Sequence, residues 1–366
     1  MMIMNLKAFL RMNFCRVIYH TGLLHLFLKY VFPRRREFPA VIINYHSYVH
    51  TLDDVIEVES SVVHRMETFK NEVRWLRKYF EIVPLDTVVE TLSRGKKFAR
   101  PTVAITIDDG FRDNFELLFP YLKEANLPVT IFLATGFIGT RQRIWIDRVA
   151  NVFLRTQKTV FTAPTDMGGK QFILDSIQSR RDAYNAVSGP LKAMPIVQRD
   201  KNIGLIEDQL GAVPEDKPVM LDWDEVRTMQ KGGVHFGAHT RTHPILTSLS
   251  SDDARREIAD SKKKIEDELQ TPVKHFAYPN GRAEDFSEEL RQFCRDIGFH
   301  SVCAVAMGNN SEPSDIWALK RIGAKLPLSF CAFHMTQAFL MSNHTSTESE
   351  RRLCNPNIQL PQSSSV

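Results

Sequence analysis

Two adjacent carboxylates, Asp108 and Asp109, follow the apolar segment 103–107 and precede Gly110. Like charges side by side at the end of a buried strand repel each other, and one pKa rises unless a cation compensates them. The alternative is a solvated turn, which is a common setting for aspartate. The pair indicates a cation site, so a metal ion is the first ligand to consider.

Two histidines, His239 and His243, follow a second apolar run at a spacing of four residues. Imidazoles at i and i+4 can converge on one ion from a single helical turn. A carboxylate from elsewhere in the fold completes a His/His/Asp set with an open position, as in catalytic zinc sites. Taken alone, such a pair is more often two polar residues on a turn. Because both signals directly follow apolar strands, their joint occurrence favours a metal site.

The two motifs together resemble those of a known family. Thr106-Ile107-Asp108-Asp109-Gly110 is similar to Thr-Phe-Asp-Asp-Gly, and His239-Thr240-x-x-His243 to His-Ser/Thr-x-x-His, of the polysaccharide deacetylases with a NodB-homology domain, carbohydrate esterase family 4. The motifs occur in the same order, and the resemblance covers residues 39–324 apart from one long insertion. It implies an α/β fold, a distorted (β/α)7 barrel of the NodB-homology type.

The resemblance also implies a role for each residue of the motifs. Asp109, His239 and His243 would hold one divalent ion, zinc in the first place, with cobalt, nickel or manganese as alternatives. Asp108 would stay off the metal and take a proton from the attacking water. The implied reaction hydrolyses the acetamide of an N-acetylhexosamine in a polysaccharide or a lipid-linked glycan and releases acetate.

A general acid must protonate the leaving amine, and we expect His46 to do this. It follows the apolar run 41–45, and the chain resembles a circularly permuted branch of the family, in which a Tyr-His ends an N-terminal strand ahead of the acidic motif. An ordinary hydrogen-bonding role is the alternative for His46. His334, near the C-terminus, is a rival candidate for the acid.

One family motif departs from its pattern here. The family's Arg-x-Pro-Tyr-Gly corresponds to Ala-Tyr-Pro-Asn-Gly, so Ala277 stands where the arginine that orients the base would be. Arg282 and Arg321 are the candidates to replace that arginine. The Pro-Asn-Gly turn could present the backbone N–H of Asn280 to the oxyanion, since glycine lets the backbone approach a ligand closely. Trp145 either stacks on a sugar ring or anchors the insertion as a buried side chain.

Strand-like and helical runs alternate from residue 39 onward, which predicts parallel β/α units. We expect strands at 41–45, 102–107, 129–134, 234–238, 274–278 and 301–306, and helices at 66–79, 114–126, 224–231, 251–270 and 284–297. Ser251 is the expected N-cap of the fourth helix. Because His46, Asp108, Asp109 and His239 directly follow strands, they should gather at the carboxyl-terminal mouth of the barrel.

The expected organisation has three parts and one interruption. Residues 1–38 form an amphipathic, basic N-terminal segment, residues 39–335 form the barrel, and residues 336–366 form a disordered tail rich in polar residues. The stretch 141–215 breaks the alternation and is expected to be a largely helical insertion beside the mouth that contributes to substrate selection.

The basic N-terminal segment leaves two interpretations open. Charges interrupt its apolar stretch too often for a membrane span, which needs about 20 mostly apolar residues, and no cleavage site typical of a signal peptide follows. Residues 1–36 could make peripheral contact with an anionic membrane surface, or they could pack against the barrel, as apolar helical stripes usually do.

Composition limits the class of protein and its partners. The chain has 366 residues, 43% hydrophobic and 25% charged, which is typical of one large globular α/β domain. The net charge of +4, with no basic stripe interleaved with aromatic residues, argues against nucleic acid as a partner. Five scattered cysteines without Cys-x-x-Cys spacing are typical of free thiols in a reducing compartment. We therefore expect a cytoplasmic protein, at the inner face of the membrane if residues 1–36 bind it.

Three functions are consistent with these residues. The first is a metal-dependent N-deacetylase, a hydrolase of non-peptide carbon–nitrogen bonds acting on carbohydrate. The second is a non-catalytic glycan-binding module, which intact Asp108 argues against and Ala277 argues for. The third is a metal amidase acting on a small non-sugar amide, which the motifs alone do not exclude.

Overall fold

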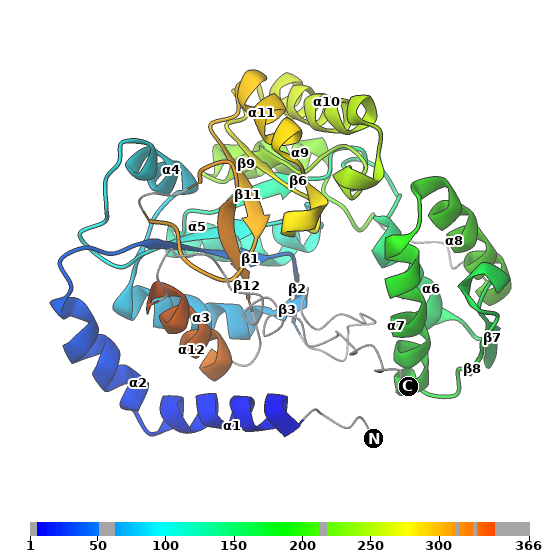
Figure 1. The fold of residues 1–366 in the computed structure, drawn as a ribbon, viewed down its shortest axis with the longest axis horizontal. Coiled ribbons are helices and arrows are strands. Elements are labelled where there is room, and N and C mark those ends of the chain that lie inside the picture. Colours follow the sequence, from blue (N-terminus) through cyan, green and yellow to red (C-terminus); the bar gives the residue numbers. More distant parts are fainter. Residues whose placement is uncertain (1–5, 51–62, 212–217, 312–314, 325–327, 341–366) are drawn as a thin grey trace, which may run out of the picture.

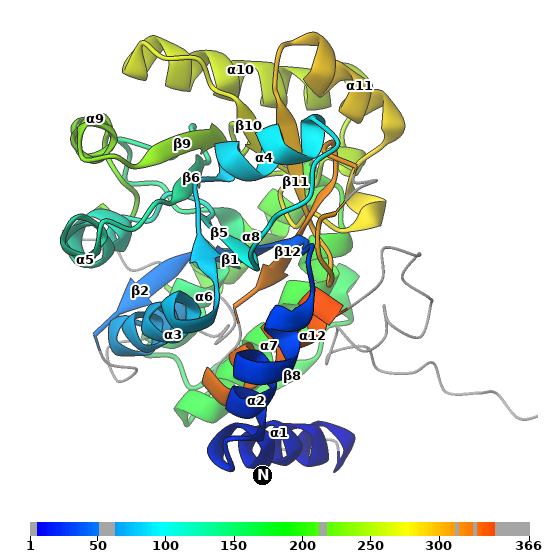
Figure 2. The same ribbon diagram turned by 90° about the vertical axis from the view of Figure 1, so that its left-hand side faces the viewer.

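The computed structural model describes residues 6–50, 63–211, 218–311, 315–324 and 328–340. Within them, seven parallel strands close into a barrel in the order β1, β12, β11, β10, β9, β6, β5 and back to β1 (Figure 1 and Figure 2). The strands are β1 Ala40–Tyr45, β5 Thr102–Ile107, β6 Thr130–Leu133, β9 His235–Ala238, β10 His275–Ala277, β11 Ser301–Val305 and β12 Leu319–Gly323. The predicted (β/α)7 barrel is therefore confirmed.

Strand β1 closes the barrel because both of its edges are paired. It runs in register with β5, from Ala40 opposite Thr102 to Tyr45 opposite Ile107, and its other edge pairs with β12. Every residue of β1 and β5 is buried, as expected of parallel strands covered on both faces. Because β1 and β5 end at the same level, the residues that follow them emerge together at one rim.

Helices surround this barrel (Figure 2). They are α3 Met66–Tyr79, α4 Leu85–Ser93, α5 Phe119–Ala125, α9 Trp223–Lys231, α10 Ser251–Leu269, α11 Glu288–Asp296 and α12 Leu328–Leu340. Short pieces complete the layer: the 3-10 turns η6 Leu246–Ser248 and η7 Ala283–Asp285, the π-helical turn η4 Asn114–Leu118, strand β4 Glu81–Ile82 beside β5, and the parallel pair β2 Ser47–Val49 and β3 Val63–Arg65.

Several element boundaries differ from the predicted ones. The helix expected at 114–126 begins with the π-helical turn η4, and the one expected at 284–297 is the turn η7 followed by α11. The N-cap of α10 is Ser250, whose side chain accepts a hydrogen bond from the Asp253 backbone, so the expected cap Ser251 is wrong by one residue. Strand β12 was not predicted, since Lys320 and Arg321 interrupt its short apolar pattern.

The expected disordered tail begins too early, because helix α12 includes residues 336–340. The sequence is still apolar there, and Met335, Ala338 and Phe339 are buried. The Phe339 ring stacks on that of Phe80 at 4.9 Å between centroids. Residues 341–366 lie outside the described residues.

The insertion stands beside the barrel as a small helical layer with its own core (Figure 1). Its elements are α6 Trp145–Arg155, β7 Val160–Thr162, η5 Thr165–Met167, β8 Gln171–Ile173, α7 Ile177–Ala193 and α8 Ile196–Leu210, with β7 and β8 forming an antiparallel hairpin. Trp145 and Ile146 pack against both this core and the core of the barrel. The start of α6 therefore joins the two.

The N-terminal segment packs one side against the domain and exposes another. It consists of α1 Leu6–His20, α2 Leu23–Leu26, the π-helical turn η1 Phe27–Val31 and the 3-10 turn η2 Phe32–Arg34. Helix α1 contacts α12, and Leu24, Leu28 and Phe32 belong to the main core. Among the described helices, none is both long enough and apolar enough to cross a bilayer.

The close packing around Gly237 in β9 leaves no room for a side chain, and this can be tested. A Cβ there would lie 2.5 Å from ring atoms of Phe132 and 2.9 Å from the His275 carbonyl oxygen. We expect Gly237→Ala to lower the free energy of unfolding by about 1–3 kcal/mol through overpacking, measured by urea denaturation. Gly204→Ala in α8 is the control, because nothing lies within 4 Å of its Cβ, and should raise stability by about 0.5–1 kcal/mol. Equal effects of the two substitutions would contradict this account of β9.

Candidate active site

The structure brings Asp109, His239 and His243 together at the mouth of the barrel. One ligand atom from each lies within 4.8 Å of the other two. His243 Nε2 is 3.2 Å and His239 Nε2 is 3.6 Å from Asp109 Oδ1. Asp109 follows β5 and both histidines follow β9, so the two motifs meet because they end strands of the same barrel.

The two histidines converge from a loop, and the helical turn considered for them is wrong. Thr240 and His243 both have left-handed backbones, with φ of 64° and 56°. The Thr240 hydroxyl accepts a hydrogen bond from the His243 backbone at 3.0 Å, and Thr135 donates its backbone N–H to the Thr240 carbonyl. These bonds hold the unusual backbone that turns both imidazoles toward Asp109.

The residues present fit a divalent ion. His239 Nδ1 lies 2.7 Å from the Ala277 carbonyl oxygen, so this nitrogen carries the proton and the lone pair of Nε2 faces Asp109. Burial lowers the pKa of both His239 and His243, which keeps them neutral as ligands must be. Asp109 Oδ1 is buried and accepts no hydrogen bond from the described residues. Two imidazoles and one carboxylate are a donor set that suits zinc.

The second carboxylate, Asp108, has a different partner. The fully buried Arg321 forms a bidentate pair with it, with Nη1 2.7 Å from Oδ1 and Nη2 2.8 Å from Oδ2. The Asn44 amide adds a bond of 2.9 Å to Oδ2. Burial alone would raise the pKa of Asp108, but the Arg321 guanidinium together with His239 and His46 more than offsets this and holds the pKa well below its usual range. By contrast, burial and then the Asp108 charge raise the pKa of Asp109.

Arg321 provides the guanidinium beside Asp108 that the alanine at position 277 cannot provide. It lies in β12, two strands from Ala277 in β10, and its guanidinium reaches Asp108 inside the barrel. Arg282, the other candidate, is about half exposed beside Glu284. The only available sequence signal was an arginine between apolar residues at 319 and 322, which is weak unless the strand is already known.

His46 lies at the same rim, after β1. Its Nε2 is 3.9 Å from Asp108 Oδ2, and a quarter of its side chain is exposed, so a ligand at the mouth can reach it. Burial lowers the pKa of His46 to about 4, and the neighbouring Asp108 charge raises it by less. The rival acid, His334, is buried in α12, which packs against α1 and α3 in the helical layer.

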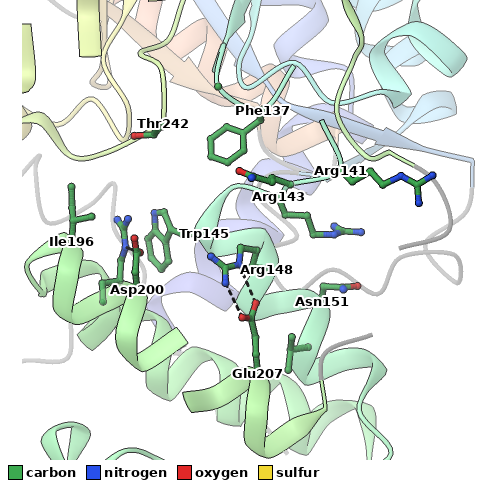
Figure 3. Close-up of a pocket in the computed structure, with 14 residues that line it drawn as sticks. Phe137, Arg141, Arg143, Trp145, Arg148, Asn151, Ile196, Asp200, Glu207 and Thr242 are labelled. Atoms are coloured by element: carbon green, nitrogen blue, oxygen red, sulfur yellow. Dashed lines mark hydrogen bonds and ion pairs between the residues drawn. The ribbon is translucent and has the colours of Figure 1, made fainter. Parts of the chain in front are cut away.

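The insertion reaches the mouth through Lys192 and Trp145. Lys192 of α7 donates to the Asn280 side chain, which in turn donates to Asp285. No sequence signal distinguished Lys192 from other helical lysines. Trp145 is partly buried and lines a cavity of about 760 Å³ between the insertion and the barrel (Figure 3). Its packing against both cores agrees with the expected role as an anchor, and stacking on a sugar ring stays a prediction.

Comparisons with known proteins agree with these motifs. A model of the polysaccharide deacetylase family matches residues 95–302. The poly-beta-1,6-N-acetyl-D-glucosamine N-deacetylase of Staphylococcus epidermidis is 24% identical over 220 residues, which cover 54% of this chain and 71% of that protein.

Solved structures show the same fold. The Streptococcus pyogenes deacetylase PplD, in complex with acetate, superimposes with a TM-score of 0.53 at 16% identity and covers 83% of this chain and 98% of its own. IcaB from Ammonifex degensii gives 0.52 at 14% identity, with 82% of this chain and 97% of that one covered.

Because Asp108 and Arg321 form a buried ion pair, we expect their contributions to the free energy of unfolding to be strongly coupled. Arg321→Gln leaves the Asp108 charge buried without its partner, so we expect a loss of about 3–5 kcal/mol in the free energy of unfolding, measured by urea denaturation. The double variant Arg321→Gln/Asp108→Asn should recover part of that loss, because the uncompensated charge is gone. Arg282→Gln is the matched control and should change stability by no more than about 0.5 kcal/mol. If the effects of Arg321→Gln and Asp108→Asn on the free energy of unfolding simply added in the double variant, the two residues would not be coupled.

Proposed function

The chain belongs to the polysaccharide deacetylase family, and on that premise we propose that it is a metal-dependent N-deacetylase. Its substrate in this proposal is an N-acetylhexosamine unit of a polysaccharide or lipid-linked glycan, whose acetamide is hydrolysed to a free amine and acetate. The main support is the pair of adjacent carboxylates with separate partners: Asp109 faces two imidazoles, and Asp108 faces Arg321. The named substrate of the staphylococcal relative is a second support.

Asp109, His239 and His243 would hold the ion. When bound, a divalent ion of this kind supplies Lewis acidity, which polarises an acetamide carbonyl and lowers the pKa of water at neutral pH. Zinc suits the donor set best, with cobalt, nickel or manganese as alternatives.

Asp108 acts as the base. The Arg321 fork and the Asn44 amide fix the orientation of its carboxylate and keep it ionised, so that it can accept the proton of the attacking water. The water oxygen then bonds to the acetamide carbon, and the carbon–nitrogen bond breaks as the nitrogen gains a proton. The backbone N–H of Asn280 is our candidate for the oxyanion donor, on a turn whose side chain Lys192 and Asp285 hold in place.

His46 delivers the proton to the leaving nitrogen. With its pKa lowered to about 4, the side chain is neutral near pH 7 and begins as a proton acceptor. Its Nε2 lies 3.9 Å from Asp108 Oδ2, which is too far for a direct hydrogen bond, so in this proposal a bridging water carries the proton from Asp108 to His46, which passes it on to the amine. The circular permutation that places this histidine ahead of the acidic motif is part of the proposal.

The alternative of a non-catalytic glycan-binding module loses its main support. It rested on the arginine missing at Ala277, whereas Arg321 pairs with the base from β12. The alternative of an amidase acting on a small non-sugar amide uses the same site and differs only in substrate, so assays on both kinds of amide separate the two.

We also propose that residues 1–36 contact an anionic membrane surface from the cytoplasmic side. This segment has seven lysines and arginines and no acidic residue, although the whole chain carries a net charge of only +4. Among its side chains that the structure describes, the apolar ones that are half or more exposed are Leu10, Phe14, Val17, Leu23, Leu26, Tyr30 and Val31. A second copy of this chain would bring like charges together, whereas anionic headgroups would compensate them.

Replacing each carboxylate in turn tests the proposed roles. We expect Asp108→Asn to keep one bound ion per chain but to lose acetate release by about 10²–10⁴-fold, because it removes the base and not a ligand. Asp109→Asn should lose the ion as well. Metal content is measured by mass spectrometry and acetate release on chitooligosaccharides.

His46→Ala should retain the ion and lose acetate release. If Asp108→Asn lost the ion as completely as Asp109→Asn, the two carboxylates would not have the separate roles proposed here. Acetate released only from small non-sugar amides would favour the amidase.

Vesicle binding tests the proposed membrane contact. Full-length protein should bind phosphatidylglycerol vesicles, bind phosphatidylcholine vesicles weakly, and dissociate as salt screens the charges. Val17→Glu/Leu23→Glu should weaken binding by about tenfold or more, because it removes apolar contact and adds like charge. Val197→Glu in α8 is the control, because Val197 is 85% exposed and lies in the insertion, outside residues 1–36. Equal binding to both lipids would refute the role of anionic headgroups, and an equal loss in the control would refute contact through residues 1–36.

A further inference from the structure

The cavity between the insertion and the barrel has the size of a ligand site. Its volume of about 760 Å³ lies within the range of roughly 300–1,000 Å³ that is typical of small-molecule pockets. Phe137 and Thr242 of the barrel loops line one side, and Trp145, Arg148 and Asp200 of the insertion line the other (Figure 3).

One of the barrel loops that line this cavity also carries the two candidate histidine ligands. Thr242, which lines the cavity, directly precedes the candidate ligand His243. Gly136 also lines it and donates its backbone N–H to the Arg241 carbonyl at 2.7 Å, in the loop between the two histidines. A Cβ at Gly136 would lie 2.7 Å from that oxygen, so the two backbones are in close contact. A chain-like ligand with one unit at the metal site could thus place a neighbouring unit in the cavity.

Four arginines line the cavity, and they give it an excess of positive charge: Arg141, Arg143, Arg148 and Arg199. Arg148 forms a bidentate pair with Glu207 at 3.0 and 2.7 Å. Arg199 contacts Asp200 at 3.1 Å, and Arg143 pairs with Asp147. Arg141 is exposed, and within the described part of the chain it forms no ion pair. One guanidinium is therefore available to a ligand.

The remaining lining suits a sugar ring. The Trp145 ring offers apolar surface. The Arg199 guanidinium lies over this ring, 5.0 Å from its centroid, in a cation–π contact. Gln142 and Asn151 add amide groups that can bond hydroxyls. Arginine forks match carboxylates and phosphates by paired hydrogen bonds, whereas a neutral sugar would leave the Arg141 charge unused.

We propose that this cavity binds an acidic sugar unit, one that carries a carboxylate or a phosphate, with Arg141 as its anion-binding group. The placement of that unit beside an N-acetylhexosamine at the metal site rests on the proposed function. The natural substrate in this inference is thus an anionic heteropolysaccharide or a phosphorylated glycan, and a neutral homopolymer is a poorer one.

Binding measured without hydrolysis tests the cavity directly. Chelator-treated full-length protein is titrated by calorimetry with three tetrasaccharides: chitotetraose, chitotetraose with one phosphate monoester, and alternating N-acetylglucosamine and glucuronate. We expect at least one anionic ligand to bind about tenfold more tightly than chitotetraose, the equivalent of one charge-assisted hydrogen bond. The ligand that gains identifies phosphate or carboxylate as the preferred group.

Arg141→Gln should abolish this preference, lowering affinity for the anionic ligand far more than for chitotetraose. Lys201→Gln is the matched control, because it removes the same charge from α8 at an exposed position outside the cavity and should keep the preference. Equal affinity for neutral and anionic ligands, or an equal effect of the two substitutions, would overturn the proposal.

Acetate release by the zinc-loaded protein is measured separately. If no ligand were deacetylated but the binding preference and its dependence on Arg141 held, the proposed function would fail and the anion-binding cavity would stand. If chitotetraose were deacetylated but no preference were found, the cavity assignment alone would fail.

Discussion

Two carboxylates that are neighbours in the chain must be compensated by different partners, and the arrangement of the site depends on this. Asp108 turns inward to the buried Arg321, while Asp109 turns to the two imidazoles. Asp109 has a left-handed backbone with φ of 76°, which lets adjacent side chains point in different directions. If one cation compensated both carboxylates, Asp108 and Asp109 could not have the separate roles of base and metal ligand that we propose. The separation keeps one carboxylate ionised and oriented while the other faces the histidines of the candidate metal site.

The barrel makes this separation possible because it delivers polar residues from several strands to one level. The register of β1 with β5 places Asn44 opposite Thr106, and the Asn44 amide then bonds Asp108 while its oxygen accepts from Arg321. The insertion adds a second wall, with Lys192 bonding Asn280 and the cavity beside Trp145. In the proposed function, the barrel supplies the chemistry, and the insertion supplies the surface where a longer ligand would be selected.

Long and strongly patterned elements were predictable from the sequence, and short or irregular ones were not. Helix α3 and strand β5 have the predicted bounds, because their apolar periodicity is unbroken. Strand β12 was missed because five residues that include Lys320 and Arg321 carry little pattern. The burial of Arg321 depends on Asp108, which follows another strand. The loop that carries His239 and His243 depends on left-handed residues held by distant backbone bonds, which local propensity does not reveal.

The two motifs and the family that they resemble were enough to predict the barrel fold and the residue types of the candidate metal site, because such motifs rarely follow apolar strands in this order by chance. Tertiary contacts identified the arginine that pairs with Asp108 in place of the one absent at Ala277, and they revealed Lys192 and the cavity with four arginines. These contacts join residues up to 213 positions apart in the chain, as Asp108 and Arg321 are. Spacing along a sequence carries no information about such pairs until strand order and register bring them together.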